Sequence, residues 1–430
     1  MKPANSLKSP KVAIHTHGCK LNQADSQSLA QKFQQAGFTV VRAAAQADVV
    51  VLNSCTVTAN SDSKARQYLR RARRNNPDAL VVVTGCYAQR AKDEPSVMES
   101  ASLVLDNRDK PTLVSTVANK LNVAAGPSVQ NQPEAALGRS RAMVKIQEGC
   151  DQVCAYCIVP KVRGRERSIP PGEIIAEINS RANSGCREAV LTGTQLGTYG
   201  FDFSEIDLPE LLRRVLAETS IDRLRVSSLQ AQEITPELLD LWKDPRLCPH
   251  FHIPLQSGSD AILRSMRRRY DTAWFAATVN LVREKFPDAG ITTDLIVGFP
   301  GEGVREFAES YSFAASIGFS DMHVFPYSIR PGTSAAYFYG QVAVDQKKER
   351  TREMLELAAA AVREFRSRTL GQTRPVLWEP AKGKDSSEVW SGLTDNYLRV
   401  RAKDSRNLGN VITDTRLTGL DGDWVAGEVV

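Results

Sequence analysis

The chain has 430 residues, of which 42% are hydrophobic and 24% are charged, a composition that is ordinary for a soluble globular protein. No stretch approaches the roughly 20 consecutive apolar residues that a membrane-spanning helix needs, which argues against a membrane protein. This length exceeds what one hydrophobic core supports and indicates two to four domains. The net charge is +6, and its basic excess lies in the first third, where residues 1–138 carry 17 Lys and Arg against 10 Asp and Glu.

The first third alternates short apolar runs with helical patterns, which predicts an open, mostly parallel α/β sheet. The predicted strands are 11–16, 38–41, 48–53, 79–84 and 103–105. The predicted helices lie near 21–36, 61–75 and 111–121. Residues from 122 to 138 have the Gly, Pro, Ser and Asn content of a linker. We therefore expect an N-terminal domain over 1–122 and a linker over 123–138.

The middle of the chain repeats this alternation with wider spacing. Its predicted strands are 142–146, 189–191, 224–227, 251–254, 291–297 and 323–325. Helical stretches separate them, and 349–369 forms one long helix of mixed charge. About six strand–helix units predict a full or partial β/α barrel over 139–371.

The last part of the sequence changes character near Gln372. Short strand-like runs alternate there with Gly, Asp and Asn turns, at 375–378, 388–390, 397–401, 411–413 and 424–430. This pattern predicts a small β-barrel over 372–430. The whole chain is therefore expected to belong to the α/β class, with a β-barrel at its C-terminal end.

The eight cysteines are interpreted through the expected compartment. The first residues, Met1 to Lys11, are polar and lack the apolar core of a signal peptide, so we expect a cytoplasmic protein. Reducing conditions disfavour disulfides there, so closely spaced cysteines indicate metal binding or catalysis. Cys186 and Cys248 are isolated in the sequence, which favours a structural role as small buried side chains.

Three cysteines follow the first predicted strand of the middle region. Cys150, Cys154 and Cys157 have the spacing C-x3-C-x2-C, which lets three thiolates reach three irons of a [4Fe–4S] cluster and leaves one iron free. A zinc site is the alternative, but it needs a fourth ligand, and no other Cys or His lies between Cys86 and Cys186. The spacing resembles that of the radical S-adenosylmethionine (SAM) superfamily, in which the free iron binds SAM and the cluster cleaves it to an adenosyl radical.

Polar and glycine-containing segments follow several predicted barrel strands, at 191–194, 254–259 and 297–301. Active sites of barrels form at these strand ends, although Gly and Pro are also simple turn formers. The residues we expect to contact SAM are Tyr156, Thr192, Gly193, Ser228, Gln256 and Gly298. The basic run Lys161, Arg163, Arg165 and Arg167 either holds a phosphate or carboxylate or is a solvated face.

Three further cysteines are far apart in the sequence but occupy equivalent places in the predicted sheet. Cys19, Cys55 and Cys86 each follow the end of a predicted strand. The carboxyl ends of parallel strands lie on one edge, where ligands bind. These cysteines therefore form a candidate metal site, with three unrelated buried thiols as the alternative.

The sequence as a whole resembles the methylthiotransferases. The resemblance is carried by the segments Gly18–Gln23, Gly85–Gln89, Gly149–Gly164, Pro254–Ser259, Asp294–Glu302, Phe325–Thr333 and Gly392–Tyr397. It implies two [4Fe–4S] clusters with SAM as cofactors: Cys150, Cys154 and Cys157 hold the SAM-cleaving cluster, and Cys19, Cys55 and Cys86 hold an auxiliary cluster involved in supplying sulfur. It also implies that the C-terminal barrel is an RNA-binding domain of the TRAM type.

Short sequence differences favour one branch of this family. GCK-x-N at Cys19 and GCYAQ at Cys86 look most like the branch that adds a methylthio group to carbon 2 of threonylcarbamoyladenosine, next to the anticodon of tRNA. The same chemistry on isopentenyladenosine in tRNA or on a ribosomal protein stays open. An alternative of another class is an RNA-binding protein whose iron–sulfur clusters are structural or redox-sensing.

The expected partners follow from this resemblance. A tRNA is the expected substrate, the reductant and the sulfur donor are unidentified, and we expect a monomer or weak oligomer. The C-terminal domain carries a net charge of −1, with 8 basic and 9 acidic residues, so its RNA binding rests on the resemblance alone. Better electrostatic evidence is the basic helix that contains Lys64, Arg66, Arg70, Arg71, Arg73 and Arg74. A solvated helix face is the alternative.

One position departs from the family pattern. Gln230 lies in the segment SSLQA, where relatives often have SSIEP. Gln230 thus replaces the glutamate of the relatives, which puts a polar role for this position in doubt.

Overall fold

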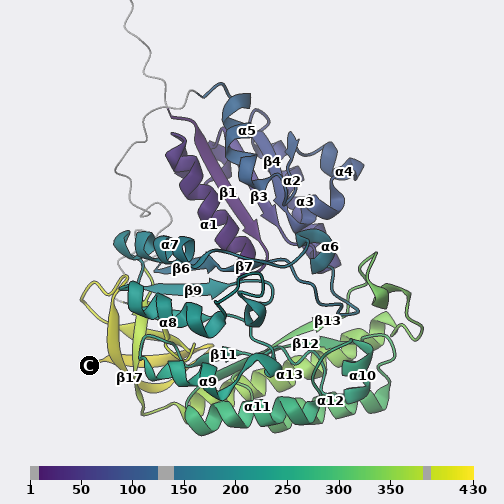
Figure 1. Cartoon of the computed structure of the whole chain (residues 1–430), viewed down its shortest axis with the longest axis vertical. Helices are drawn as coiled ribbons and strands as arrows, with labels where there is room; N and C mark the ends of the chain where they lie inside the picture. Colours follow the sequence, from purple (N-terminus) through teal and green to yellow (C-terminus); the bar gives the residue numbers. More distant parts are fainter. Residues whose placement is uncertain (1–8, 124–139, 381–388) are drawn as a thin grey trace, which may run out of the picture. The chain divides into compact units, whose positions relative to one another are not determined.

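The computed structural model describes residues 9–123, 140–380 and 389–430. The chain divides into two compact units (Figure 1). Unit 1 contains the N-terminal residues together with Ile158–Arg165, and unit 2 contains Gly138–Cys157 and Glu166–Val430. The predicted linker over 123–138 lies outside the described residues, apart from Val123. Among the helices of the described residues, none is long and apolar enough to cross a membrane.

Unit 1 is built on a five-stranded sheet in the order β2-β1-β3-β4-β5, with every neighbouring pair parallel. Its strands are β1 (Lys11–His17), β2 (Thr39–Val41), β3 (Val49–Ser54), β4 (Leu80–Gly85) and β5 (Leu103–Val104). All six residues of the central strand β3 are buried, as expected of a parallel strand covered on both faces. The prediction of an open parallel sheet is therefore confirmed.

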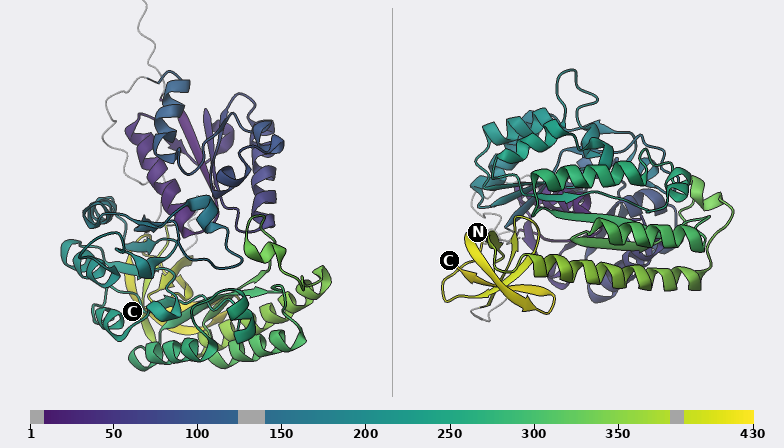
Figure 2. Two further views of the ribbon diagram at one scale, coloured as in Figure 1. Left: turned by 45° about the vertical axis from the view of Figure 1, so that its right-hand side comes forward. Right: turned by 90° about the horizontal axis from the view of Figure 1, so that it is seen from below.

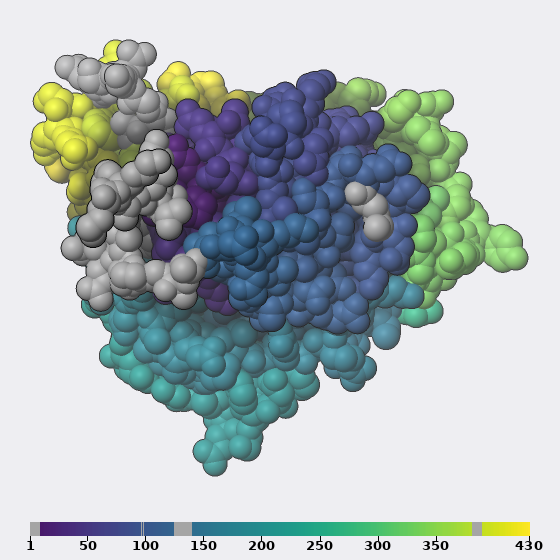
Figure 3. Space-filling model, turned by 90° about the horizontal axis from the view of Figure 1, so that it is seen from above, coloured from purple at the N-terminus to yellow at the C-terminus, as the bar shows by residue number. Residues whose placement is uncertain are grey.

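Helices cover both faces of this sheet (Figure 1). They are α1 (Lys20–Gln35), α2 (Ala59–Asn75), α3 (Cys86–Ala91), α4 (Pro95–Met98) and α5 (Leu113–Lys120). Apolar residues of α1 and α5 pack on one face, around Phe33 and Leu113. Those of α2 and α3 pack on the other face, around Leu69 and Tyr87. Figure 3 shows one face of this unit as packed atoms, coloured purple to blue.

A short helix from the middle of the chain completes unit 1. Helix α6 (Val159–Arg163) follows Cys157 in the sequence and lies beside α3. Ile158 and Val162 form a small buried cluster with Cys86. The helix ends at Gly164, whose φ of 77° is readily adopted only by glycine.

Unit 2 contains six parallel strands in two three-stranded sheets. These are β6 (Arg141–Lys145), β9 (Glu188–Thr192) and β10 (Arg223–Val226) in one, and β11 (His250–His252), β12 (Gly290–Val297) and β13 (Asp321–Pro326) in the other. Isolated parallel bridges, Leu224 to Leu247 and Ser228 to His252, join the two sheets. The strands therefore form the predicted partial β/α barrel.

Helices cover the outer face of this partial barrel (Figure 1). They are α7 (Pro171–Asn183), α8 (Leu208–Glu218), α9 (Pro236–Leu239), α10 (Asp260–Ser265), α11 (Thr272–Lys285), α12 (Val304–Ile317) and α13 (Val344–Arg368). Alternate strand residues such as Leu191, Leu224 and Ile291 belong to the core shared with these helices. Because strand side chains alternate between faces, the residues between them, such as Arg225 and Asp294, line the inner face, or lumen, of the barrel.

The C-terminal part of unit 2 is a closed barrel in the order β14-β15-β16-β18-β17 (yellow in Figure 2). Its strands are β14 (Thr373–Trp378), β15 (Val389–Thr394), β16 (Arg399–Lys403), β17 (Ile412–Asp421) and β18 (Trp424–Val429). Trp378, Val400 and Leu417 are fully buried in its core. The predicted barrel is confirmed, although β17 is much longer than the segment predicted there.

The turn Thr394–Tyr397 joins this barrel to the amino ends of the partial-barrel strands. Arg225 donates to the backbone oxygens of Asp395 at 2.9 Å and Thr394 at 3.5 Å. The ring of Tyr397 stacks on His250 with centroids 4.3 Å apart. At Gly290, a Cβ atom would lie 2.2 Å from the backbone oxygen of Asn396. The turn thus covers the amino end of the lumen, and the carboxyl end is left for a site.

Candidate active site

The loop that carries Cys150, Cys154 and Cys157 lies between β7 (Gln147–Glu148) and α6, in the part that belongs to unit 2. The backbone N–H of Gln152 donates to Sγ of Cys150 at 3.4 Å. Nη1 of Arg268 donates to Sγ of Cys154 at 3.5 Å. Burial, together with the neighbouring Cys154 thiol, raises the pKa of Cys150 to about 11. Three thiols on one short loop, one of them hard to deprotonate without a cation and two of them beside N–H donors, suit a metal or an iron–sulfur cluster.

The cysteine loop is fixed to the rest of unit 2 between its second and third cysteines. The N–H of Ala155 donates to the backbone oxygen of Met266 at 3.0 Å, and its own oxygen accepts from Ala335 at 2.8 Å. Ala155 is buried in a cluster that includes Phe299, and Tyr156 packs edge-to-face on that ring. Such fixed geometry is what a cluster-binding loop requires.

The residues expected to contact SAM lie at consecutive strand ends of one edge. Thr192 ends β9, Gly193 follows it, and Ser228 comes two residues after β10. Gln256 and Gly298 follow β11 and β12. The carboxyl ends of these parallel strands share one edge of the barrel, next to the loop that carries Tyr156. The structure therefore brings them to one rim, and their contact with SAM stays a prediction.

Two of these rim positions also have structural reasons for their residue type. Gly298 has a φ of 75°, and a Cβ there would lie 2.2 Å from Cγ of Lys347. Gln256 has a φ of 68° and exchanges backbone hydrogen bonds with β12, at Asp294 and Ile296, both at 2.8 Å. These backbone constraints shape the rim whatever it binds.

A network of amides surrounds Glu233 at the same edge, in the short 3-10 turn Ala231–Glu233. Its carboxyl group accepts from the backbone N–H of Gln230 at 2.8 Å and from the side chain of Gln195. Gln230 in turn donates to Gln195. Burial raises the pKa of Glu233 to about 7. An acidic side chain three residues after Gln230 therefore lies in the amide network at this edge, a contact that the sequence alone does not show.

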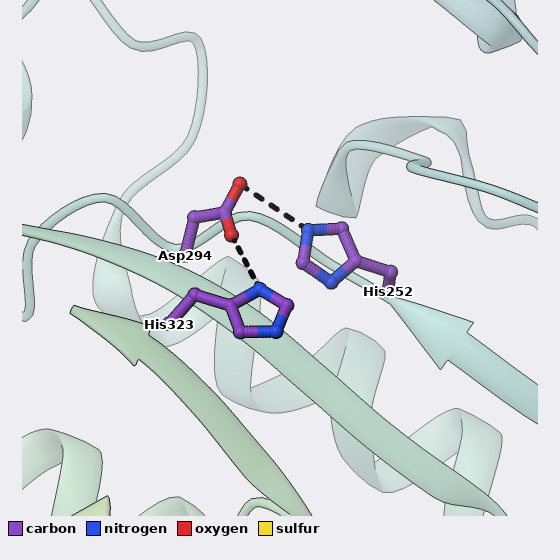
Figure 4. Close-up of side chains that lie close together, drawn as sticks. All are labelled: His252, Asp294 and His323. Carbon is purple, nitrogen blue, oxygen red and sulfur yellow. Dashed lines mark hydrogen bonds and ion pairs between the residues drawn. The ribbon is translucent and has the colours of Figure 1, made fainter. Parts of the chain in front are cut away.

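Two histidines and one carboxylate meet in the lumen, and sequence reasoning missed them (Figure 4). Asp294 on β12 is 3.3 Å from Nε2 of His252 and 3.1 Å from Nδ1 of His323. Nδ1 of His252 is 2.9 Å from Oγ1 of Thr292. Burial alone would raise the pKa of Asp294, but hydrogen bonds from His252 and His323 hold it well below its usual range. The arrangement is a hydrogen-bonded triad whose exposed member, His323, is 53% accessible.

In unit 1, the structure places Cys19, Cys55 and Cys86 at the ends of three adjacent strands. Cys19 precedes α1 and follows β1, Cys55 directly follows β3, and Cys86 directly follows β4. Burial, together with the nearby thiols of Cys19 and Cys86, raises the pKa of Cys55 to about 12. A Cβ at Gly18 would lie 2.9 Å from Cβ of Cys55, so glycine allows this close approach. An all-sulfur donor set of this kind fits an iron–sulfur cluster.

Polar side chains fix these thiols. Sγ of Cys19 donates to Oδ1 of Asn22 at 3.2 Å, and Asn22 donates to Asn53 at 3.1 Å. On the other side, Nε of Arg163 donates to Sγ of Cys86 at 3.2 Å. The basic run after Cys157 therefore does not act as one group. Arg163 is buried against a cysteine, whereas Lys161 is exposed.

The basic helix α2 has one buried and one exposed side. Ala65, Leu69 and Ala72 pack into the core. The cations on its exposed side are Lys64, Arg70, Arg71 and Arg74. Within the part of the chain that the structure describes, none of these four cations forms an ion pair with a carboxylate, so this side is a positive surface of the kind that binds phosphates.

Two family models match the chain. Residues 11–105 match the family described as "Uncharacterized protein family UPF0004", and residues 144–314 match the Radical SAM superfamily. Among solved structures, the radical S-adenosylmethionine methyltransferase TsrM of Kitasatospora setae is similar with a TM-score of 0.53 and 15% identity, over 74% of this chain and 73% of that one. At this identity, the similarity establishes the fold alone.

Three related proteins align over nearly the whole chain. The threonylcarbamoyladenosine tRNA methylthiotransferase MtaB of Bacillus subtilis is 36% identical over 97% of this chain and 96% of that protein. The enzyme of the same name from Aquifex aeolicus is 37% identical over 94% of this chain and 99% of that protein. The tRNA-2-methylthio-N(6)-dimethylallyladenosine synthase of Dictyoglomus thermophilum is 32% identical over 97% and 99%, respectively.

Proposed function

This chain belongs to the methylthiotransferase family of radical SAM enzymes, and we propose that it adds a methylthio group to carbon 2 of threonylcarbamoyladenosine in tRNA. The observation that carries the proposal is the presence of two separate sets of three cysteines, one at a sheet edge of unit 1 and one on a loop of unit 2. The choice of nucleoside is supported by the higher identity to relatives named for threonylcarbamoyladenosine, 36% and 37%, than to one named for dimethylallyladenosine, 32%.

We assign Cys150, Cys154 and Cys157 to the SAM-binding cluster. Cys19, Cys55 and Cys86 are assigned to the auxiliary cluster. When bound, the first cluster and SAM would supply an adenosyl radical, and the second cluster would take part in supplying sulfur. One thiol of each set accepts from an arginine: Cys154 from the half-buried Arg268 in unit 2, and Cys86 from the buried Arg163 in unit 1.

The residues of the partial barrel position the reactants. The rim formed by Thr192, Gly193, Ser228, Gln256 and Gly298, with Tyr156 beside it, is the proposed SAM site. The lumen triad of His252, Asp294 and His323 offers hydrogen-bonding groups to a nucleobase that enters the barrel. The turn Thr394–Tyr397 covers the opposite end, so the rim end is the proposed entrance for the substrate.

We propose that the tRNA binds two parts of the chain, helix α2 and the C-terminal barrel. The exposed cations of α2 attract the phosphate backbone, which dominates affinity for nucleic acids. The C-terminal barrel is proposed to be a TRAM-type domain over 372–430, after a catalytic domain over 139–371 and an N-terminal domain over 1–122. We place the enzyme in the cytoplasm as a monomer or weak oligomer.

The direct test is nucleoside analysis of tRNA from a strain that lacks the gene. We expect 2-methylthio-threonylcarbamoyladenosine to disappear and its unmodified precursor to accumulate, with restoration by the wild-type gene and not by a Cys55→Ala variant. Loss of a methylthiolated isopentenyladenosine instead would assign the chain to the other nucleoside. An unchanged set of tRNA nucleosides would favour a ribosomal-protein substrate or a redox-sensing role.

A further inference from the structure

Arg163 reaches the auxiliary cysteines of unit 1 from a distant part of the sequence. It is the last residue of α6, six positions after Cys157 of the SAM-binding triad. Its side chain is only 2% exposed, and Nε lies 3.2 Å from Sγ of Cys86. Burying a charged guanidinium costs desolvation free energy. The contact of Arg163 with the sulfur of Cys86 therefore calls for a functional reason.

The surroundings of Arg163 fix its orientation. Nη1 donates to Oδ2 of Asp25 at 3.1 Å, and the same oxygen accepts from Nζ of Lys110 at 2.6 Å. Asp25 lies in α1 and is 2% exposed. Asn107 donates to the backbone oxygen of Val162 at 2.6 Å, which holds the end of α6. Both side-chain and backbone contacts therefore direct Nε of Arg163 toward Cys86.

Hydrogen bonds to ligand sulfurs and nearby charge set the reduction potentials of iron–sulfur clusters. A cation that donates to a sulfur stabilises the more negative, reduced cluster more than the oxidised one. Asp25 pairs with both Arg163 and Lys110, so the charges of these three side chains sum to one positive charge.

We propose that Arg163 is a positioning residue that holds the sulfur of Cys86 and raises the reduction potential of the auxiliary cluster. The inference rests on the proposed assignment of Cys19, Cys55 and Cys86 to that cluster. Helix α6 directly follows the SAM-binding triad in the sequence. The segment next to the ligands of one cluster therefore carries the cation that contacts a ligand of the other, Cys86. Arg268 contacts Cys154 in unit 2, so the two clusters are tuned by different arginines.

The experiment isolates the auxiliary cluster by replacing Cys150, Cys154 and Cys157 with Ala in the full chain. After anaerobic reconstitution, iron is counted and the midpoint potential is measured by redox titration followed by electron paramagnetic resonance. Arg163→Gln, Arg163→Lys and Lys161→Gln are compared in this background. Lys161→Gln is the matched control, since it removes a positive charge from the same helix at an exposed position.

We expect Arg163→Gln to lower the equilibrium constant for one-electron reduction by about tenfold or more, which corresponds to a shift of about −59 mV. Arg163→Lys keeps the charge but loses the planar donor, so a smaller shift in the same direction is expected. Lys161→Gln should match the parent protein.

A parent-like potential and spectrum in Arg163→Gln would overturn the proposal. If that variant does not retain iron, a parent-like potential in Arg163→Lys would overturn it instead. Absence of iron in the parent itself would refute the cluster assignment rather than the role of Arg163.

Discussion

At the scale of single residues, arginines from distant parts of the sequence donate to the cysteine sulfurs: Arg163 to Cys86 and Arg268 to Cys154. The spacing of Cys150, Cys154 and Cys157 is local, and strand ends locate Cys19, Cys55 and Cys86. Arg163 and Arg268 reach sulfur only through tertiary contacts, and no spacing rule relates them to the cysteines they touch. The lumen triad was missed for the same reason, since its three members come from three different strands.

The buried carboxyl group of Glu233 predicts a specific pH dependence of stability. Its pKa is about 7 in the folded protein against an ordinary value of 4.5, so the folded state binds this proton more tightly than the unfolded state. The free energy of unfolding therefore falls as pH rises between these two values. We expect Glu233→Gln to abolish this fall and to stabilise the protein at pH 8 by on the order of 2 kcal/mol relative to wild type.

Thermal denaturation of wild type and Glu233→Gln, measured anaerobically at several pH values, checks this prediction. The difference in Tm between the two proteins should grow from pH 5 to pH 8. A difference that stays constant over this range would show that Glu233 is not buried in its protonated form. Because both proteins carry the same cysteines, effects of pH on the clusters cancel in the comparison.

At the scale of elements, strands and long helices were predicted well because their patterns are local. The buried run of β3 and the amphipathic pattern of α2 are examples. The short helices α3 and α4 were not predicted, since they are too short to show helical periodicity. The length of β17 was also underestimated. Only alternate residues of this strand, such as Thr415 and Leu417, are buried, so its apolar signal is weak.

The turn Thr394–Tyr397 is expected to fasten the C-terminal barrel to the partial barrel. Tyr397 stacks on His250, and the guanidinium of Arg225 lies 4.9 Å from its ring centroid. Arg225 also pairs with Glu188, at 3.1 Å. Tyr397→Ala removes the ring that covers this buried ion pair, and we expect it to lower stability by about 2 kcal/mol.

Thermal denaturation of the variant and of Tyr339→Ala tests this role. Tyr339 is 99% exposed, so its removal should change stability by less than about 0.5 kcal/mol. Equal, small effects of the two substitutions would mean that Tyr397 does not hold the barrel. Because Tyr397 covers the buried ion pair of Arg225 and Glu188, removing its ring is expected to lower the free energy of unfolding. Burial alone would raise the pKa of Glu188, but Arg225 and Arg223 lower it to about 2.

At the scale of the whole molecule, the basic surface of α2 should control affinity for tRNA. Arg70 and Arg74 are exposed, and their replacement by Gln removes two cations without touching the core. We expect weaker tRNA binding, and the slope of log K against log salt concentration should fall by about 1 for each arginine that contacts a phosphate. The effect should be similar for different tRNA sequences.

Filter binding or fluorescence anisotropy at several salt concentrations measures this effect. A matched control replaces Arg213 and Arg352 with Gln, since both are exposed but already paired with glutamates, Glu210 and Glu356. An equal loss of affinity in the control would indicate a general effect of net charge. An unchanged salt slope in the α2 variant would place the tRNA elsewhere on the chain.

The central claim is that the chain holds two clusters, each on three cysteines. The measurement that tests it most directly is iron and sulfide counting after anaerobic reconstitution of three proteins: wild type, the triple Ala variant of Cys19, Cys55 and Cys86, and the triple Ala variant of Cys150, Cys154 and Cys157. We predict about eight irons in the wild type and about four in each variant. About four irons in the wild type, all lost in the triple Ala variant of Cys150, Cys154 and Cys157, would contradict the account. Cys19, Cys55 and Cys86 would then hold no cluster.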